Sequence, residues 1–204
     1  MEPRLRPVAA FTFGYMAVAL VAGLRSGNSE FLFYIAVMLV LIGVVWTVNR
    51  SIEISTGALW ALSLWGLAHM AGGLVVVPEG WPVNAESRVL YSLWLIPDRL
   101  KYDHIVHTYG FGVTTWVCWQ GLKSAITRRS GHTPAPTFGL LVLAAAAGLG
   151  FGALNEVVEF FATLTMAETN VGGYANTGWD LVANTVGATV AVLLIRWFGR
   201  DGTP

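Results

Sequence analysis

Long runs of hydrophobic residues, separated by brief polar stretches, recur along the whole chain. A bilayer core about 30 Å thick requires roughly 20 apolar residues per helix. Runs of that length predict membrane-spanning helices at residues 7–24, 31–49, 57–78, 102–122, 137–165 and 178–198. The pattern therefore predicts an all-α fold, a polytopic transmembrane helical bundle of about six spans.

The connections between the predicted spans are short, except for residues 79–101. That segment contains SRVLYSLWLI between Pro82 and Pro97, and it is too short to cross the membrane again. We predict a short interfacial or re-entrant helix there, on the outer face. Near the N-terminus, an Ala-x-Ala at 17–19 raises the alternative of a cleaved signal peptide. Because the apolar run continues to Leu24, we predict that the first helix is retained.

Composition supports a membrane protein of one domain. Of the 204 residues, 55% are hydrophobic and 12% are charged, which excludes an ordinary soluble domain. The predicted spans occupy most of the chain, so we predict a single transmembrane domain over residues 1–204. The formal net charge is zero, which excludes a basic surface for nucleic acid. The single cysteine, Cys118, lies within an apolar run and forms no intrachain disulfide.

The distribution of Lys and Arg predicts the orientation. One side of the predicted bundle carries Arg4, Arg6, Arg50, Lys123, Arg128, Arg129, Arg196 and Arg200. The other side carries Arg25, Arg88, Arg99 and Lys101. Since positive charge accumulates on the cytoplasmic side, this pattern predicts that both termini are cytoplasmic.

Polar residues interrupt four of the predicted spans at overlapping depth. They are His69 in the third span, Asp103, His104 and His107 in the fourth, Asn155, Glu156 and Glu159 in the fifth, and Asp180 and Asn184 in the sixth. Asp103 and His107 are four residues apart and share a helix face. The same spacing relates Asp180 to Asn184. We therefore predict one polar centre in the outer half of the membrane.

This predicted centre has more negative charge than positive. It holds four acids, whereas no Lys or Arg lies deeper in the spans than Lys101 or Arg196. An uncompensated charge in a membrane costs at least a few kcal/mol, so protons or divalent cations must offset the acids. As metal ligands we predict His69, Asp103, His107, Glu156 and Asp180, with Glu159 as the catalytic acid that handles protons. The residue types suit Zn, Mn or Fe without distinguishing them. His104, Asn155 and Asn184 complete the predicted cluster.

Each of these residues also has an ordinary structural explanation. Asp103 and Asp180 can cap helix starts, and Asn184 can bridge helices through its amide. A lone histidine such as His69 is more often packed and hydrogen-bonded than a ligand. The glycines of GLGFG at 148–152 indicate close helix packing rather than a nucleotide loop, because no strand precedes them. Small residues at Gly72, Gly73, Gly187 and Ala188 are interpreted in the same way.

Four motifs in order resemble known families. HMAGG (69–73), YDHIVHTYGFG (102–112), NEVVEF (155–160) and GWDLVANTVGA (178–188) are similar to the sequence blocks of the YjdF-like family of bacterial inner-membrane proteins. The last three also resemble the VanZ-like family, whose pattern ends in Asp-x-x-x-Asn-x-x-Gly. YjdF-like sequences carry a second Asp where Asn184 stands, so helix six is closer to the VanZ-like pattern. The resemblance implies a small helical bundle in the bacterial cytoplasmic membrane and a connection to the cell envelope.

Two classes of function remain open from the sequence. The first is a metal-dependent membrane enzyme, a hydrolase in its simplest form, acting on or binding a lipid or lipid-linked envelope molecule. The second is a carrier or sensor in which the same acids bind a cation or a proton, and a purely structural subunit is a further alternative. The crowding of polar residues in one leaflet favours the first, because a transport pathway would continue to the cytoplasmic ends of the spans. The substrate, the reaction and the oligomeric state are not determined by the sequence.

Overall fold

The computed structural model describes residues 2–27, 29–83, 88–166, 169 and 171–199. Its α-helices are α1 (Arg6–Ser26), α2 (Ser29–Ile52), α3 (Thr56–Leu74), α4 (Tyr102–Ser130), α5 (Phe138–Thr165) and α6 (Tyr174–Phe198). A 3₁₀ turn, η1 (Pro3–Leu5), leads into α1. Since the structure is 80% helical, the predicted all-α membrane bundle is confirmed. The predicted spans lie on these helices, although α3 ends earlier than expected and α4 extends further.

Composition alone identifies fewer spans than there are helices. Over the described part of the chain, four helical segments are long and apolar enough to cross a membrane: Pro3–Ser26, Ser29–Ile52, Phe138–Thr165 and Tyr174–Phe198. The other two helices are α3, which contains no charged residue, and α4, which is clearly more polar. In α4 the reason is visible in the sequence, because charged or imidazole side chains lie near both of its ends. Both helices are held in the bundle by contacts with their neighbours, α3 with α1 and α4 with α5 and α6.

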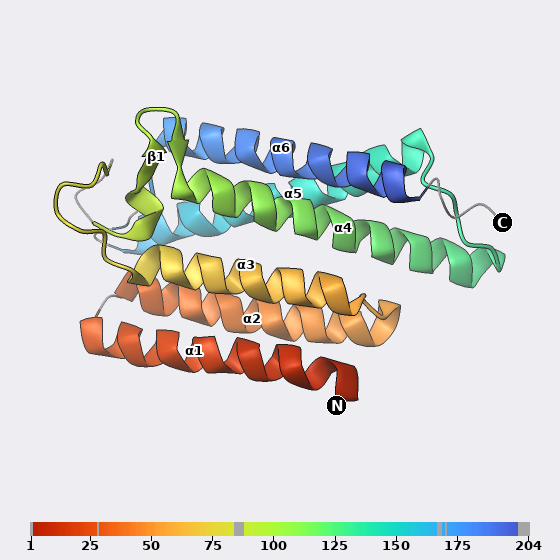
Figure 1. The fold of residues 1–204 in the computed structure, drawn as a ribbon, viewed down its shortest axis with the longest axis horizontal. Helices are drawn as coiled ribbons and strands as arrows, with labels where there is room; N and C mark the ends of the chain where they lie inside the picture. The colour runs from red at the N-terminus through yellow and green to blue at the C-terminus, as the bar shows by residue number, and fades with distance from the viewer. Residues whose placement is uncertain (1, 28, 84–87, 167–168, 170, 200–204) are drawn as a thin grey trace.

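The helices lie side by side with α4 in a central position (Figure 1). This helix contacts α2, α3, α5 and α6, whereas α1 packs on α2 and α3. The start of α1 and the end of α6 lie at the same end of the bundle (Figure 1). Side chains bind backbone carbonyls at this end, where Arg128 donates to Ser51 O at 2.7 Å and Arg196 donates to Pro136 O at 3.0 Å.

The opposite end carries the connection between α3 and α4, and its described residues, 75–83 and 88–101, are called the cap. They contain a 3₁₀ turn, η2 (Leu90–Ser92), and two short antiparallel strands, β1 (Trp94–Ile96) and β2 (Leu100–Lys101). Isolated bridges join Val76 to Val89 and Val83 to Leu93. The prediction of a helix here is therefore wrong for the described residues beyond the three-residue turn η2, whereas the interfacial or re-entrant position of the segment stays a prediction. Prolines within the segment disfavour a helix, and a turn with Asp98 at a positive φ of 56° pairs the strands instead.

Small residues bring the central helices into backbone contact. A Cβ atom added to Gly187 on α6 would collide with backbone atoms of Thr108 and Gly112 on α4. The Thr108 hydroxyl also donates to Ala183 O across the same contact, at 3.2 Å. On α5, Gly148 makes room for Thr115 and Gly152 makes room for Asn184. The interpretation of GLGFG as a packing motif is confirmed at these two glycines.

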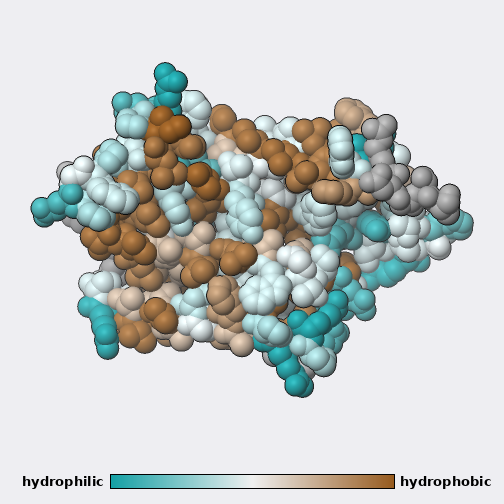
Figure 2. Space-filling model, viewed as in Figure 1, coloured by the Kyte–Doolittle hydropathy of each residue, from teal (hydrophilic) through white to brown (hydrophobic). Residues whose placement is uncertain are grey.

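The outer surface of the bundle is apolar, and its centre is partly polar. Large hydrophobic side chains are exposed along the helices, including Phe13, Val40, Phe138, Leu164 and Leu193. Figure 2 shows hydrophobic residues along the middle of the molecule and hydrophilic ones gathered toward the two ends. By contrast, the largest fully buried side chains include Asn184, Thr115 and Asp180. An apolar exterior around a polar centre is the arrangement expected for helices in a membrane.

The glycine contact predicts the outcome of a substitution. Gly187→Ala should separate α4 from α6 and lower the free energy of unfolding by about 1–3 kcal/mol, because the added methyl group meets backbone rather than a flexible side chain. Thermal unfolding in detergent measures the change. Gly150→Ala is the matched control, since a Cβ atom at Gly150 has no other atom within 4 Å. A loss of stability at position 150 equal to that at 187 would contradict the packing explanation.

Candidate functional site

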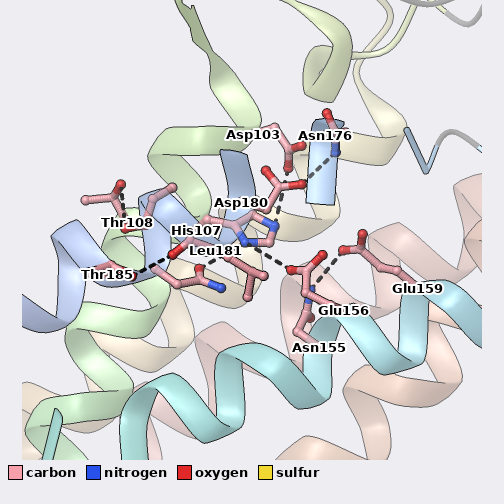
Figure 3. A network of polar contacts seen from close by, with 12 residues as sticks. Asp103, His107, Thr108, Asn155, Glu156, Glu159, Asn176, Asp180, Leu181 and Thr185 are labelled. Carbon is pink, nitrogen blue, oxygen red and sulfur yellow. Dashed lines mark hydrogen bonds and ion pairs between the residues drawn. The ribbon is translucent and has the colours of Figure 1, made fainter. Parts of the chain in front are cut away.

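His107 occupies the centre of a polar cluster where α4, α5 and α6 meet (Figure 3). Its side chain is 6% exposed. The Nε2 atom lies 3.6 Å from Asp103 Oδ1, one helical turn earlier on α4. The Nδ1 atom lies 3.1 Å from Asn184 Oδ1 on α6 and 3.8 Å from Glu156 Oε1 on α5. One imidazole ring thus contacts polar groups from three helices.

The contact with Asn184 determines which nitrogen of the His107 ring carries hydrogen. An amide oxygen can only accept a hydrogen bond, so Nδ1 donates to Asn184 Oδ1. In the neutral ring, Nε2 then has a free lone pair, and it faces the Asp103 carboxylate. Metal-binding histidines have this arrangement, in which the second nitrogen donates to a neighbouring oxygen and holds the ring in place.

Two groups of potential metal ligands share His107. Among the described residues, the first group is Asp103, His107 and Asp180, and the second is His107, Glu156 and Glu159. Within each group the ligand atoms lie within 4.8 Å of one another. The first group offers two carboxylates and an imidazole, a donor set that divalent transition metals accept. A single cation at the centre of that group would contact all three side chains.

Several buried acceptors in the cluster have no hydrogen-bond partner among the described residues. They are both carboxylate oxygens of Glu156 and the Oδ1 atom of Asp180. Glu156 is 9% exposed, and Asp180 is fully buried. An unpaired buried carboxylate oxygen is costly, so these atoms need a partner in the folded protein, and a proton, a cation or a water can supply it.

Lys101 supplies a positive charge that the sequence prediction placed outside the cluster. It is the last residue of β2, its side chain is 6% exposed, and its Nζ atom lies 3.4 Å from Asp103 Oδ2. Nζ also donates to Asn176 Oδ1, while Asn176 Nδ2 donates to Asp180 Oδ2 at 2.6 Å. The sequence pattern predicted that no Lys or Arg accompanies the acids, and this is wrong because Lys101 supplies one positive charge. The position of Lys101 two residues before Asp103 could have indicated this contact. For Asn176, the only indication in the sequence was its position four residues before Asp180.

Glu159 lies at the edge of the cluster, on the side of Glu156 that is away from His107 (Figure 3). Its Oε1 atom accepts a hydrogen bond from Asn155 Nδ2 at 2.8 Å. Asn155 precedes Glu159 by one helical turn, so α5 itself orients this carboxylate. Glu159 is less buried than Glu156, which leaves it closer to the exterior.

His69 belongs to neither of the two ligand groups. Its ring packs edge to face against Tyr91 at 5.5 Å and Tyr34 at 6.1 Å, and it lies 6.0 Å from Trp65. Burial raises the pKa of Tyr91 well above its ordinary value, so this phenol remains protonated beside His69. The structure therefore brings α4, α5 and α6 to the cluster and places the α3 residue in an adjoining aromatic environment. A role for His69 as a ligand stays a prediction.

His104 has a role in the local structure of α4. Its Nδ1 atom accepts a hydrogen bond from the backbone N–H of Lys101 at 3.3 Å, which caps the start of the helix. The ring lies between the indoles of Trp94 at 6.5 Å and Trp179 at 6.1 Å. Its Nε2 atom is buried and has no hydrogen-bond partner among the described residues.

Comparison with known proteins identifies the family. The sequence model of a family described as predicted membrane proteins, DUF2238, matches residues 7–201. No curated protein and no solved structure matches the chain. The family match does not confirm the similarity to YjdF-like and VanZ-like proteins, which stays a prediction. Since the match extends over nearly all of the helices, the chain belongs to the DUF2238 family of predicted membrane proteins.

Proposed function

We propose that this protein is a membrane-embedded metalloenzyme that holds a divalent cation in its polar centre and acts on a lipid or lipid-linked molecule of the cell envelope. The observation that carries the proposal is the set of buried, unpartnered carboxylate oxygens on Glu156 and Asp180 around His107. Four carboxylates face one ammonium there, so further positive charge is needed.

Asp103, His107 and Asp180 are the proposed primary metal ligands, and Glu156, whose Oε1 atom lies 3.8 Å from His107 Nδ1, stays a predicted further ligand. Asn184 supports this choice because it leaves Nε2 of His107 free on the side of Asp103. Asn176 supports it too, since its bond to Asp180 Oδ2 orients that carboxylate and leaves Oδ1 unpartnered. Three protein ligands leave coordination positions open for water and substrate, as in catalytic rather than structural sites. The mixed oxygen and nitrogen donors suit Zn, Mn or Fe.

The proposed reaction is hydrolysis of an ester bond. A bound divalent cation would polarise the substrate and make a neighbouring water more acidic. We assign Glu159 to accept one proton of that water as the water oxygen bonds to the carbonyl or phosphoryl atom. The bond to the leaving oxygen then breaks, and the same proton passes to that oxygen. Glu159 suits this role because Asn155 orients it and it is more exposed than Glu156.

An apolar groove along α4 supports a lipid as the substrate. It has a volume of about 710 Å³ and lies between α3, α4 and α6. None of the cluster residues lines it, and its α4 residues Ile105 and Gly112 lie on the opposite face of that helix from Asp103. Leu100 of the cap is also in its lining, so an acyl chain in the groove would reach the cap end of the bundle.

For localisation, we propose the bacterial cytoplasmic membrane with both termini in the cytoplasm. The Lys and Arg counts support this orientation. Burial of Lys101 strengthens the asymmetry, because that residue no longer contributes an exposed charge to the cap end.

A second candidate function is a carrier or sensor that binds protons or cations. The contacts from Lys101 through Asn176 to Asp180 favour it, because they offset part of the negative charge without a metal. In the proton-binding form of this candidate, the remaining carboxylates would bind protons, and purified protein would hold no stoichiometric metal.

Metal content tests the first proposal directly. Protein purified in detergent without chelator should contain about one divalent metal ion per chain, and Asp103→Asn and Asp180→Asn should each lose most of it because a charged ligand is removed. Elemental analysis by mass spectrometry measures the content. Glu79→Gln, at an exposed cap position, is the matched control and should retain the metal.

Asn184→Leu should weaken the affinity for the metal by about 10–100-fold, since it removes only the acceptor that holds His107. Absence of metal from the wild-type protein would reject the metalloenzyme and favour the second candidate.

Turnover of envelope lipids tests the catalytic assignment. Metal-loaded protein should convert a component of a bacterial membrane lipid extract into a hydrolysis product, detected by mass spectrometry. Glu159→Gln should retain the metal and lower the rate by about 10²–10⁴-fold, because it removes the proton acceptor. If Glu159→Gln turned over as fast as the wild type, Glu159 would have no catalytic role.

Orientation is tested by labelling single cysteines in intact cells after Cys118→Ala removes the native thiol. Glu79→Cys in the cap should react with a membrane-impermeant maleimide from outside, because the cap lies at the proposed outer end. Ser130→Cys, at the end of α4, should react only after the membrane is permeabilised. The reverse pattern would invert the proposed topology.

A further inference from the structure

Two buried side chains at the cap end of the cluster have no role in the proposed metal ligation. Lys101 and His104 are three residues apart at the start of α4, where such spacing brings side chains to neighbouring positions on the helix surface. They are 5% and 6% exposed. Both can donate hydrogen bonds, whereas the four carboxylates of the cluster, when ionised, can only accept them.

His104 has a donor that nothing in the described structure uses. Because its Nδ1 atom accepts from the backbone N–H of Lys101, the neutral ring carries its hydrogen on Nε2. That Nε2–H is buried and unpartnered. Trp94 and Trp179 lie near the ring, at centroid distances of 6.5 and 6.1 Å. A buried unsatisfied donor is costly and indicates an acceptor beyond the described residues, which a bound ligand can supply.

Lys101 has a different electrostatic environment with and without a metal ion. Without one, its ammonium pairs with Asp103 and bonds to Asn176. With a divalent cation at the proposed site, the charges of Asp103 and Asp180 are offset by that cation. The ammonium of Lys101 then has no carboxylate partner of its own among Asp103 and Asp180. Metal loading therefore offsets the two acids nearest Lys101, while Glu156 and Glu159 lie on the other side of His107, and it places open coordination positions beside an ammonium and an unused N–H.

From this we infer that the cap end of the centre binds the phosphate group of the substrate, with Lys101 as its charge partner and His104 Nε2–H as a hydrogen-bond donor. The inference rests on the proposed metal centre and specifies its substrate class as a phosphate ester. A phosphate has enough oxygens to meet a cation, an ammonium and an imidazole N–H together, whereas a carboxylate has only two. The group can belong to a lipid headgroup or to a soluble phosphate, which have the same recognition chemistry.

The test uses full-length protein loaded with Mn²⁺, whose paramagnetism broadens the ³¹P resonance of a nearby phosphate. One arm adds inorganic phosphate, and the other uses nanodiscs that contain phosphatidic acid, with diacylglycerol nanodiscs as the blank. Saturable broadening is expected in at least one arm, and which arm responds identifies the source. Lys101→Met should weaken phosphate binding at least tenfold while the Mn²⁺ content stays at the wild-type level or rises, because a charge-assisted contact is lost and a repulsive cation is removed.

Two further variants control the experiment. Arg99→Gln removes an exposed cation from the same cap and should leave phosphate binding unchanged. His104→Asn retains an acceptor near the Nδ1 position but removes Nε2, so it should weaken phosphate binding without reducing the Mn²⁺ content.

Normal Mn²⁺ content with no phosphate binding, or with equal phosphate binding by wild type and Lys101→Met, would overturn the inference and leave the metal centre intact. If the wild type binds no Mn²⁺, the metal centre fails, and calorimetry with phosphate decides the inference: binding that requires Lys101 retains it, and no such binding overturns it.

Discussion

The backbone contact between α4 and α6 is the constraint on which the polar centre depends. Only glycine at position 187 allows α6 to approach Thr108 and Gly112 on α4 this closely. That approach places Asn184 against His107 and sets Asp180 in the same ligand group as Asp103. Gly152 lets α5 join the pair by leaving space for Asn184. Without these small residues the helices would separate, and the carboxylates would lose the neighbours that make their burial tolerable.

Charge then determines what the centre can do. Three helices contribute carboxylates, but the ammonium of Lys101 comes from the cap, a short β-structure rather than a membrane helix. The described structure thus combines an acidic centre within the bundle with a single cation from its end. Amides fill the intermediate positions, because Asn176 links Lys101 to Asp180 and Asn184 fixes His107. Such amides orient charged groups without adding charge of their own, and hydrogen bonds of this kind hold the ligating side chains of metal sites in place.

The cap also connects the centre to its surroundings. Its second strand leads directly into α4, so Lys101 and His104 take their positions from both the strand pairing and the helix start. The apolar groove also reaches the cap, where Leu100 is in its lining, although neither Lys101 nor His104 lines it. The proposed metal and the inferred phosphate contact therefore share the cap end of the bundle, and the groove extends from that end along another face of α4.

The sequence by itself determined the helices and much of the cluster, because apolar runs and four-residue spacings are local properties of the chain. From them follow the all-α membrane bundle, the shared face of Asp103 and His107, and the packing role of Gly148 and Gly152. Local patterns could not place Lys101, whose burial depends on the fold of the cap, nor show that the His69 ring packs among Tyr34, Trp65 and Tyr91. They also predicted a helix in a connection that pairs as strands, since a short segment rich in β-branched and aromatic residues is decided by its partners. Tertiary structure alone decided which nitrogen of His107 is free, because that depends on Asn184 lying 77 residues away in the chain.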